Sequence, residues 1–248
     1  MNLASSLRYR AKWAKLGVLY ARKPDIGRIR VGGQNVRLEL PAAEQGAQEH
    51  EFHKIVLEDC YRLKEVPRAS TILDIGANIG LFAIAARHKF PNATIHCYEP
   101  NPSVLPYLRS HADQVGALCF SEAVGLSDGT ISLETSQDGS LFSVTKENAS
   151  GQIDQLSFSR CVAKLGNVDL LKLDCEGAEW EIFKDRETWQ RVHNLVMEYH
   201  LWAKEGSTVS TVQEEISSLG FDKIEILEDD PQWGRAFAAK ANADLSST

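Results

Sequence analysis

The sequence of 248 residues contains no apolar run that approaches the roughly 20 residues needed to span a bilayer. A secretory signal is also missing, because Arg8, Arg10, Lys12 and Lys15 interrupt the first segment, where an apolar stretch would be needed. The five cysteines are scattered and never form a Cys-x-x-Cys pair, which indicates reduced thiols and no structural zinc. We therefore expect a cytoplasmic protein.

An excess of positive charge is likewise missing, since the formal net charge is -7, whereas nucleic-acid-binding domains are typically basic. The exception is the segment of residues 1–30, in which eight Lys and Arg side chains stand against Asp25 alone. A basic helix there either docks on the acidic remainder of the chain or contacts an anionic membrane surface. Nucleic acid is therefore not expected as a partner, and peripheral membrane contact stays open.

The order of apolar segments predicts an α/β domain with a small N-terminal extension. In residues 1–41, two short apolar runs flank a Gly-Gly pair, which is typical of a β-hairpin. Residues 42–248 begin with an amphipathic helix over 44–63 and then alternate strands with helices. Seven strands are expected at 72–75, 94–98, 117–124, 169–174, 192–200, 221–227 and 235–240. We predict a doubly wound, mostly parallel, Rossmann-like sheet with an antiparallel last strand, and irregular structure over 136–160.

The strand at 72–75 leads through a glycine turn into an Ala-rich helix, an arrangement that brings nucleotides to the end of a strand. The spacing of Gly76 and Gly80 departs from the Gly-x-Gly-x-x-Gly of dinucleotide sites, which disfavours a nicotinamide-dependent oxidoreductase. Asp74 suits the ammonium of a cationic ligand such as S-adenosylmethionine, and Asn78 suits its carboxylate. Glu99, at the end of the next strand, is placed to accept both ribose hydroxyls. The alternative is that the glycines only ease packing.

A second motif makes the interpretation more specific. The stretch Lys172-Leu-Asp-Cys-Glu-Gly-Ala-Glu179 resembles the Lys-x-Asp-x-Glu-Gly-x-Glu signature of the FkbM family of S-adenosylmethionine-dependent methyltransferases. The stretches 73–80 and 98–102, and Ala123 with Ser127-Asp128, stand where that family has its other motifs, so the resemblance covers about residues 70–200. The Thr-Leu-Asp element that usually precedes the family's fourth strand is missing from the segment 157–165.

The resemblance implies a methyltransferase domain over residues 42–248 that uses S-adenosyl-L-methionine. It further implies an O-methyltransferase whose partner is a small-molecule or glycan acceptor, with its hydroxyl on a sugar, a glycolipid or a secondary metabolite. Glu122 and Ala123, at the end of the third strand, are expected beside adenine. The residues predicted to bind the cofactor are Asp74, Gly76, Ala77, Asn78, Gly80, Glu99, Pro100, Asn101, Glu122 and Ala123.

Acidic residues and a histidine at the ends of the fourth and fifth strands are the candidates for catalysis. A hydroxyl acceptor needs a base for its proton, and Asp174, Glu198 or His200 is expected to take that role. Lys172 lies on the same strand face as Asp174 and needs a carboxylate partner. Alternatively, Lys172 with Glu179 or Glu198 only ties the sheet to its helix. The full set of catalytic candidates is Asp174, His200, Glu198, Lys172, Glu176 and Glu179.

Two questions stay open at this level. Asp174, Glu198 and His200 also form an oxygen and nitrogen set suited to a divalent ion, but their spacing is not diagnostic of a metal, and metal use is not favoured. A protein that keeps the nucleotide pocket without catalysis would carry the same motifs. The sequence does not choose the acceptor, the regiochemistry or the oligomeric state.

Overall fold

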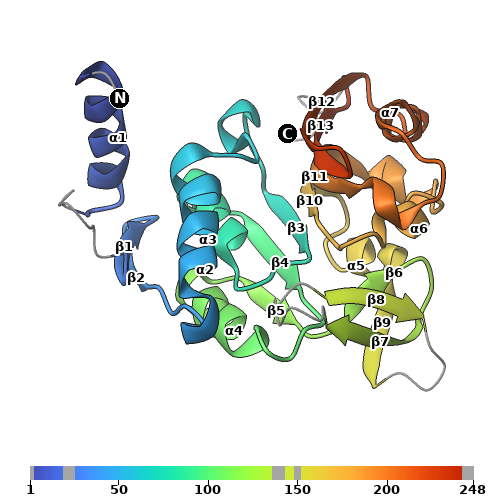
Figure 1. Ribbon diagram of the computed structural model, residues 1–248, viewed down its shortest axis with the longest axis horizontal. Helices are drawn as coiled ribbons and strands as arrows, with labels where there is room; N and C mark the ends of the chain where they lie inside the picture. The colour runs from blue at the N-terminus through green and yellow to red at the C-terminus, as the bar shows by residue number, and fades with distance from the viewer. Residues whose placement is uncertain (1–2, 19–25, 136–142, 148–151, 242–248) are drawn as a thin grey trace.

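The structure is a computed structural model, and it describes residues 3–18, 26–135, 143–147 and 152–241. Its centre is a seven-stranded sheet in the order β12-β13-β11-β10-β3-β4-β5 (Figure 1). The strands are β3 (Thr71–Ile75), β4 (Thr94–Tyr98), β5 (Leu118–Phe120), β10 (Val168–Leu173), β11 (Val192–His200), β12 (Lys223–Asp230) and β13 (Trp233–Ala239). Neighbours pair in parallel except at β13, which is antiparallel to β11 and β12. The predicted sheet with an antiparallel last strand is confirmed.

Helices cover both faces of this sheet, as a doubly wound fold requires (Figure 1). Ile72 of β3 belongs to a core cluster with α2, α3 and α4, whereas the next residue, Leu73, belongs to a second cluster with α5, α6 and α7. The helices are α1 (Leu3–Lys15), α2 (Gln45–Phe52), α3 (Leu81–Lys89), α4 (Leu105–Val115), α5 (Phe158–Ala163), α6 (Glu179–Ile182) and α7 (Val209–Ser218). Short helical turns are η1 (Ala42–Glu44), η2 (His53–Glu58), η3 (Leu63–Glu65), η4 (Thr188–Arg191) and η5 (Leu201–Ala203).

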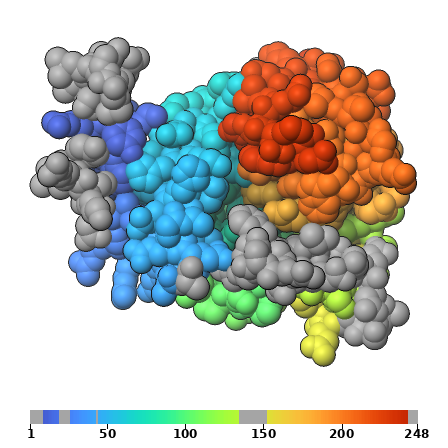
Figure 2. Space-filling view, viewed as in Figure 1, coloured from blue at the N-terminus to red at the C-terminus, as the bar shows by residue number. Residues whose placement is uncertain are grey.

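The N-terminal segment packs on the first of these clusters. The hairpin consists of β1 (Arg28–Val31) and β2 (Gln34–Arg37). Its turn residues Gly32 and Gly33 have φ angles of 56° and 86°, which suit a two-residue turn. Trp13 of α1 is fully buried, with its ring centroid 5.9 Å from that of Phe52, and Figure 2 shows this segment against the body. The basic helix therefore docks on the body. Among the described residues, no helix has the length and apolar character to cross a membrane.

A second sheet, of four strands in the order β6-β9-β7-β8, follows β5 along the chain. Its strands are β6 (Ala123–Gly125), β7 (Gly129–Thr135), β8 (Ser143–Glu147) and β9 (Ile153–Ser157). Two expectations are wrong here. The segment 117–124 is not one strand, because the chain leaves the large sheet at the end of β5 and enters the small one at β6. The segment 136–160 is not irregular throughout, because it contains β8, β9 and the start of α5; residues 136–142 and 148–151 lie outside the described ranges.

The predicted helix over 44–63 is shorter than expected and ends in a turn. After α2 the helical path continues through η2 only to Glu58, and Asp59 has a left-handed φ of 61°. The Asp59 carboxylate accepts the backbone N–H of Leu63 at 2.7 Å, so the side chain stabilises the turn that ends the helix. Tyr61, within this turn, reaches the carboxyl ends of β10 and β11.

Candidate active site

The glycine turn after β3 brings the carboxyl ends of three strands together. Gly76 has a φ of 74°, and a Cβ atom there would lie 1.6 Å from the backbone oxygen of Asp174, so only glycine fits. Gly76 and Ala77 both donate their N–H groups to the carbonyl of Tyr98, each at 3.0 Å. The side-chain oxygen of Asn78 is buried without a hydrogen-bond partner among the described residues. An unsatisfied buried acceptor of this kind is expected where a ligand binds.

Glu99 anchors a small cavity beside this turn. Its two carboxylate oxygens accept the backbone N–H groups of Asn78 and Asn101, each at 2.8 Å. Burial raises the pKa of Glu99 above its usual value, and the two hydrogen bonds partly oppose that shift. The cavity has a volume of about 80 Å³ and brings together the predicted cofactor residues Gly76, Asn78, Glu99, Pro100, Glu122 and Ala123.

The other predicted cofactor residues lie outside this small cavity. Ala77 lines the larger cavity described below. Gly80, with a φ of 88°, forms the start of α3. The side-chain oxygen of Asn101 accepts the backbone N–H of Ser103 at 2.9 Å and thereby shapes the loop before α4. Asp74 is fully buried and lines neither of the two cavities.

Lys172 is a buried cation between two carboxylates. Its Nζ lies 3.4 Å from Asp74 Oδ1 and 3.4 Å from Asp174 Oδ2, and it also donates to the backbone carbonyl of Gly76. Burial lowers the pKa of Lys172, but the two aspartates outweigh burial, so the net shift is upward. Burial raises the pKa of Asp74 to about 6, against the opposing effect of Lys172. The partners of Lys172 are therefore these two aspartates and not Glu179 or Glu198.

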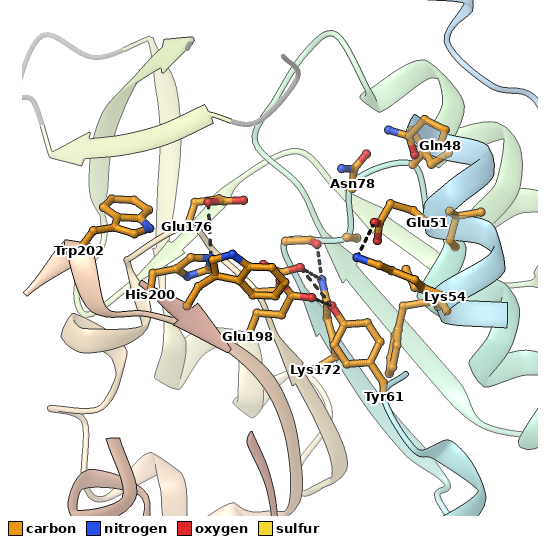
Figure 3. Close-up of a pocket in the computed structure, with 18 residues that line it drawn as sticks. Gln48, Glu51, Lys54, Tyr61, Asn78, Lys172, Glu176, Glu198, His200 and Trp202 are labelled. Atoms are coloured by element: carbon orange, nitrogen blue, oxygen red, sulfur yellow. Dashed lines mark hydrogen bonds and ion pairs between the residues drawn. The ribbon is translucent and has the colours of Figure 1, made fainter. Parts of the chain in front are cut away.

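A larger cavity, of about 360 Å³, lies between α2 and the ends of β10 and β11 (Figure 3). Glu176, Glu198 and His200 stand on one side of it, and Gln48 and Glu51 of α2 stand on the other. Both cavities have the same four residues in their linings, namely Gly76, Asn78, Asp174 and Glu176. The two cavities therefore adjoin at the end of β10.

Tyr61 links two of the predicted catalytic carboxylates. Its hydroxyl lies 3.2 Å from Asp174 Oδ2 and 3.2 Å from Glu198 Oε1. A phenol has one proton, so Tyr61 donates to only one of these oxygens at a time. Burial, followed by the negative charge of Asp174, raises the pKa of Glu198 to about 8.

Glu179 fixes the imidazole of His200. The fully buried carboxylate accepts from Nδ1 of His200 at 3.0 Å and from its backbone N–H at 2.8 Å. The other ring nitrogen, Nε2, lies 3.6 Å from Glu176 Oε2. Burial lowers the pKa of His200, but the hydrogen bond to Glu179 more than reverses this and brings it to about 9. Burial raises the pKa of Glu176 to about 7. Glu179 thus lies behind His200 and holds the orientation of its ring.

Several residues of the larger cavity escaped the sequence-based prediction. Glu51 and Lys54 form an ion pair at 3.4 Å on the α2 side, and Tyr61, Trp202 and Trp233 also line the cavity. The amphipathic pattern over 44–63 gave one usable signal, because it separates an apolar face from a polar one. It does not reveal that part of the polar face borders a cavity instead of solvent.

The chain matches known proteins over the region that holds these motifs. The profile of the Methyltransferase FkbM domain matches residues 74–223. Methyltransferase 1 of Beauveria bassiana is 27% identical over 178 residues, which are 59% of this chain and 72% of that protein. Methyltransferase sdnD of Sordaria araneosa is 27% identical over 224 residues, 73% of this chain and 84% of that protein. The 31-O-demethyl-FK506 methyltransferase FkbM of Streptomyces tacrolimicus is 24% identical over 190 residues, 60% of this chain and 73% of that protein.

Proposed function

Because this chain belongs to the FkbM methyltransferase family and is an S-adenosylmethionine-dependent methyltransferase, we propose that it methylates a hydroxyl oxygen of a small-molecule acceptor. A sugar, a glycolipid or a secondary metabolite is the class of acceptor that we expect. The observation that carries this proposal is the row of acidic residues on one side of the larger cavity. Glu198 lies within that cavity, and Asp174 and Glu176 lie where the two cavities adjoin. The name of one relative, 31-O-demethyl-FK506 methyltransferase, specifies an oxygen acceptor for that protein.

The residues around the smaller cavity fit the cofactor. Glu99 uses one lone pair of each carboxylate oxygen on a backbone N–H, so further lone pairs remain for ribose hydroxyls. The buried oxygen of Asn78, which has no hydrogen-bond partner within the described ranges, and the close turn at Gly76 suit the amino-acid end of the cofactor. When bound, S-adenosylmethionine supplies a methyl group on a positively charged sulfur. Asp174 and Glu176, which border both cavities, place negative charge where that positive charge is favoured.

Glu176 is the residue that we propose as the base for the acceptor hydroxyl. Among the described residues its carboxylate makes no hydrogen bond and has only the 3.6 Å contact with His200 Nε2. Its φ of 50° is unusual for a residue other than glycine, and strained backbone of this kind is often found at active sites. The other candidates are already engaged, namely Asp174 by Lys172 and Tyr61, Glu198 by Tyr61, and His200 by Glu179.

An assay with methyl-labelled cofactor and a small-molecule extract of the host tests the proposal. We expect products whose fragmentation by mass spectrometry places the label on oxygen. Glu176→Gln should lower the rate by about 10²–10⁴-fold, the usual contribution of a positioned base. The matched control is Glu181→Gln, which changes an exposed carboxylate paired with Lys184 and should leave turnover unchanged. Label on nitrogen or carbon alone would refute the hydroxyl acceptor, and full turnover by Glu176→Gln would refute the base.

A further inference from the structure

Three potential metal ligands meet in the larger cavity. Glu198 and His200 lie two residues apart on β11 and so share a strand face, and Asp174 follows the neighbouring parallel strand β10. One ligand atom from each of the three side chains lies within 4.8 Å of the others. From this arrangement and the contacts around it, we propose that Asp174, Glu198 and His200 bind a divalent metal ion.

The orientation of His200 fits this role. Metal-binding histidines commonly donate the N–H of their second ring nitrogen to a carboxylate, which fixes the tautomer and the direction of the ring. Here Nδ1 of His200 bonds to Glu179 Oε1 at 3.0 Å, and Glu179 is fully buried. Glu179 is itself held in place by the backbone N–H of Gly177 at 2.8 Å. Nε2 is therefore left as the ring nitrogen for a ligand on the side of the cavity.

The two carboxylates are oriented by one shared donor. The Tyr61 hydroxyl contacts Asp174 Oδ2 and Glu198 Oε1, each at 3.2 Å. Among the described residues, the second oxygen of each carboxylate accepts no hydrogen bond, although both side chains line the cavity. On each carboxylate one oxygen thus faces the Tyr61 hydroxyl, and the other is available to a cation.

The site is also short of positive charge. The connected group contains the carboxylates of Asp74, Asp174, Glu176, Glu179 and Glu198. Within the described residues, Lys172 and His200 are the basic side chains in contact with this group. Glu51 and Lys54, across the cavity, pair with each other. Buried charges are unfavourable unless they are compensated, and a divalent ion would supply the missing compensation.

Two carboxylates and one imidazole suit a divalent first-row ion such as Mn²⁺. An ion held by these three protein ligands would keep further coordination positions for other oxygens, such as the hydroxyl oxygen of the acceptor. Metal coordination makes a bound hydroxyl a stronger acid, so its proton passes more readily to Glu176. This catalytic role rests on the proposed function, whereas binding of the metal does not.

Titration of the metal-free full chain with Mn²⁺ tests the inference without cofactor or acceptor. The loss of the electron paramagnetic resonance signal of free Mn²⁺ counts the bound ions. We expect one site, with affinity lowered by roughly 10–100-fold in Glu179→Gln, the usual effect of losing the partner that orients a ligand. Asp174→Asn and Glu198→Gln should lose at least as much. The control is Glu51→Gln, because Glu51 lines the same cavity but is not one of the three proposed ligands. This variant should bind Mn²⁺ with the affinity of the wild type.

Two results would overturn the site. One is a wild-type chain that binds no Mn²⁺ at submillimolar concentration, and the other is wild-type affinity in both Asp174→Asn and Glu198→Gln. Thermal unfolding of each variant confirms that it is folded, and His200→Gln provides a further ligand variant if one of the others is not. Calorimetric titration of the same metal-free protein with S-adenosylmethionine keeps the two proposals apart. Cofactor binding without Mn²⁺ binding would reject the metal site and leave the proposed function standing.

Discussion

Replacing Gly76 by alanine should disrupt the junction of β3 and β10 on which the site is built. A φ of 74° costs a residue with a Cβ atom about 1–2 kcal/mol relative to glycine. The larger effect is steric, because the new Cβ would lie 1.6 Å from the backbone oxygen of Asp174. The backbone of Asp174 is itself held in place, since its N–H donates to the carbonyl oxygen of Ile75 at 3.1 Å. A backbone atom cannot move aside as a flexible side chain can. We expect a loss in the free energy of unfolding of at least about 4 kcal/mol, a size that marks a severe local conflict.

Two other glycines separate the conformational effect from the steric one. Gly33 has a φ of 86° and no heavy atom within 4 Å of the place that an alanine methyl group would take, so Gly33→Ala measures the conformational effect alone. Gly80 has a φ of 88°, and a methyl group there would meet the tip of Leu108 at 3.0 Å and, at an ordinary contact distance of 3.5 Å, the Cβ of His111, so Gly80→Ala should fall between the two. Equilibrium urea unfolding of the three variants and the wild type provides the measurement. The steric reasoning fails if Gly76→Ala is destabilised no more than Gly33→Ala.

Glu99→Ala should weaken S-adenosylmethionine binding by about 1.5–3 kcal/mol in a calorimetric titration, because a charged hydrogen-bond acceptor is lost; wild-type affinity would remove Glu99 from the cofactor site. Tyr61→Phe should lower the free energy of unfolding by about 1–3 kcal/mol, because it removes the hydroxyl that donates to Asp174 or Glu198, and unchanged stability would contradict that hydrogen bond. Trp13→Ala should destabilise the chain by about 3–5 kcal/mol, since this indole is fully buried, whereas a loss below about 1 kcal/mol would indicate a separable extension.

The glycine turn and the acidic residue at the end of β4 could be predicted because they depend on local chemistry. The turn after β3 requires glycine at position 76, and a carboxylate at the end of β4 follows from the motif around Glu99. The alternation of strands and helices then places the ends of β3, β4 and β10 at one edge of the sheet. The function of Asp74 could not be predicted in the same way, because its partner Lys172 lies opposite it on a neighbouring strand, and strand register is not visible in the motif.

The predictions from sequence are wrong where the structure depends on contacts between residues that are distant in the sequence. The apolar pattern predicts one strand over 117–124. In the structure Ala123 pairs with Gln155 in the other sheet, so the strand ends before Ala123, and the sequence of this segment alone does not reveal that partner. Tyr61 belongs to no motif, and its role depends on residues that are 113 and 137 positions further along the chain. Its position also depends on the turn at Asp59, which the helical pattern does not show.

The same distinction bears on acceptor choice. The family match begins at residue 74 and ends at 223, so it includes the glycine turn and the acidic residues from Asp174 to His200. The lining of the larger cavity extends beyond it, with Gln48, Glu51, Lys54, Ile55 and Tyr61 before the match and Trp233 after it. Because the residues proposed to face the cofactor lie within the match and much of the opposite side of the cavity lies outside it, we expect members of the family to share a cofactor site and still accept different molecules. We therefore expect the residues of α2, Tyr61 and Trp233, which line that side of the cavity, to contribute to the choice of acceptor.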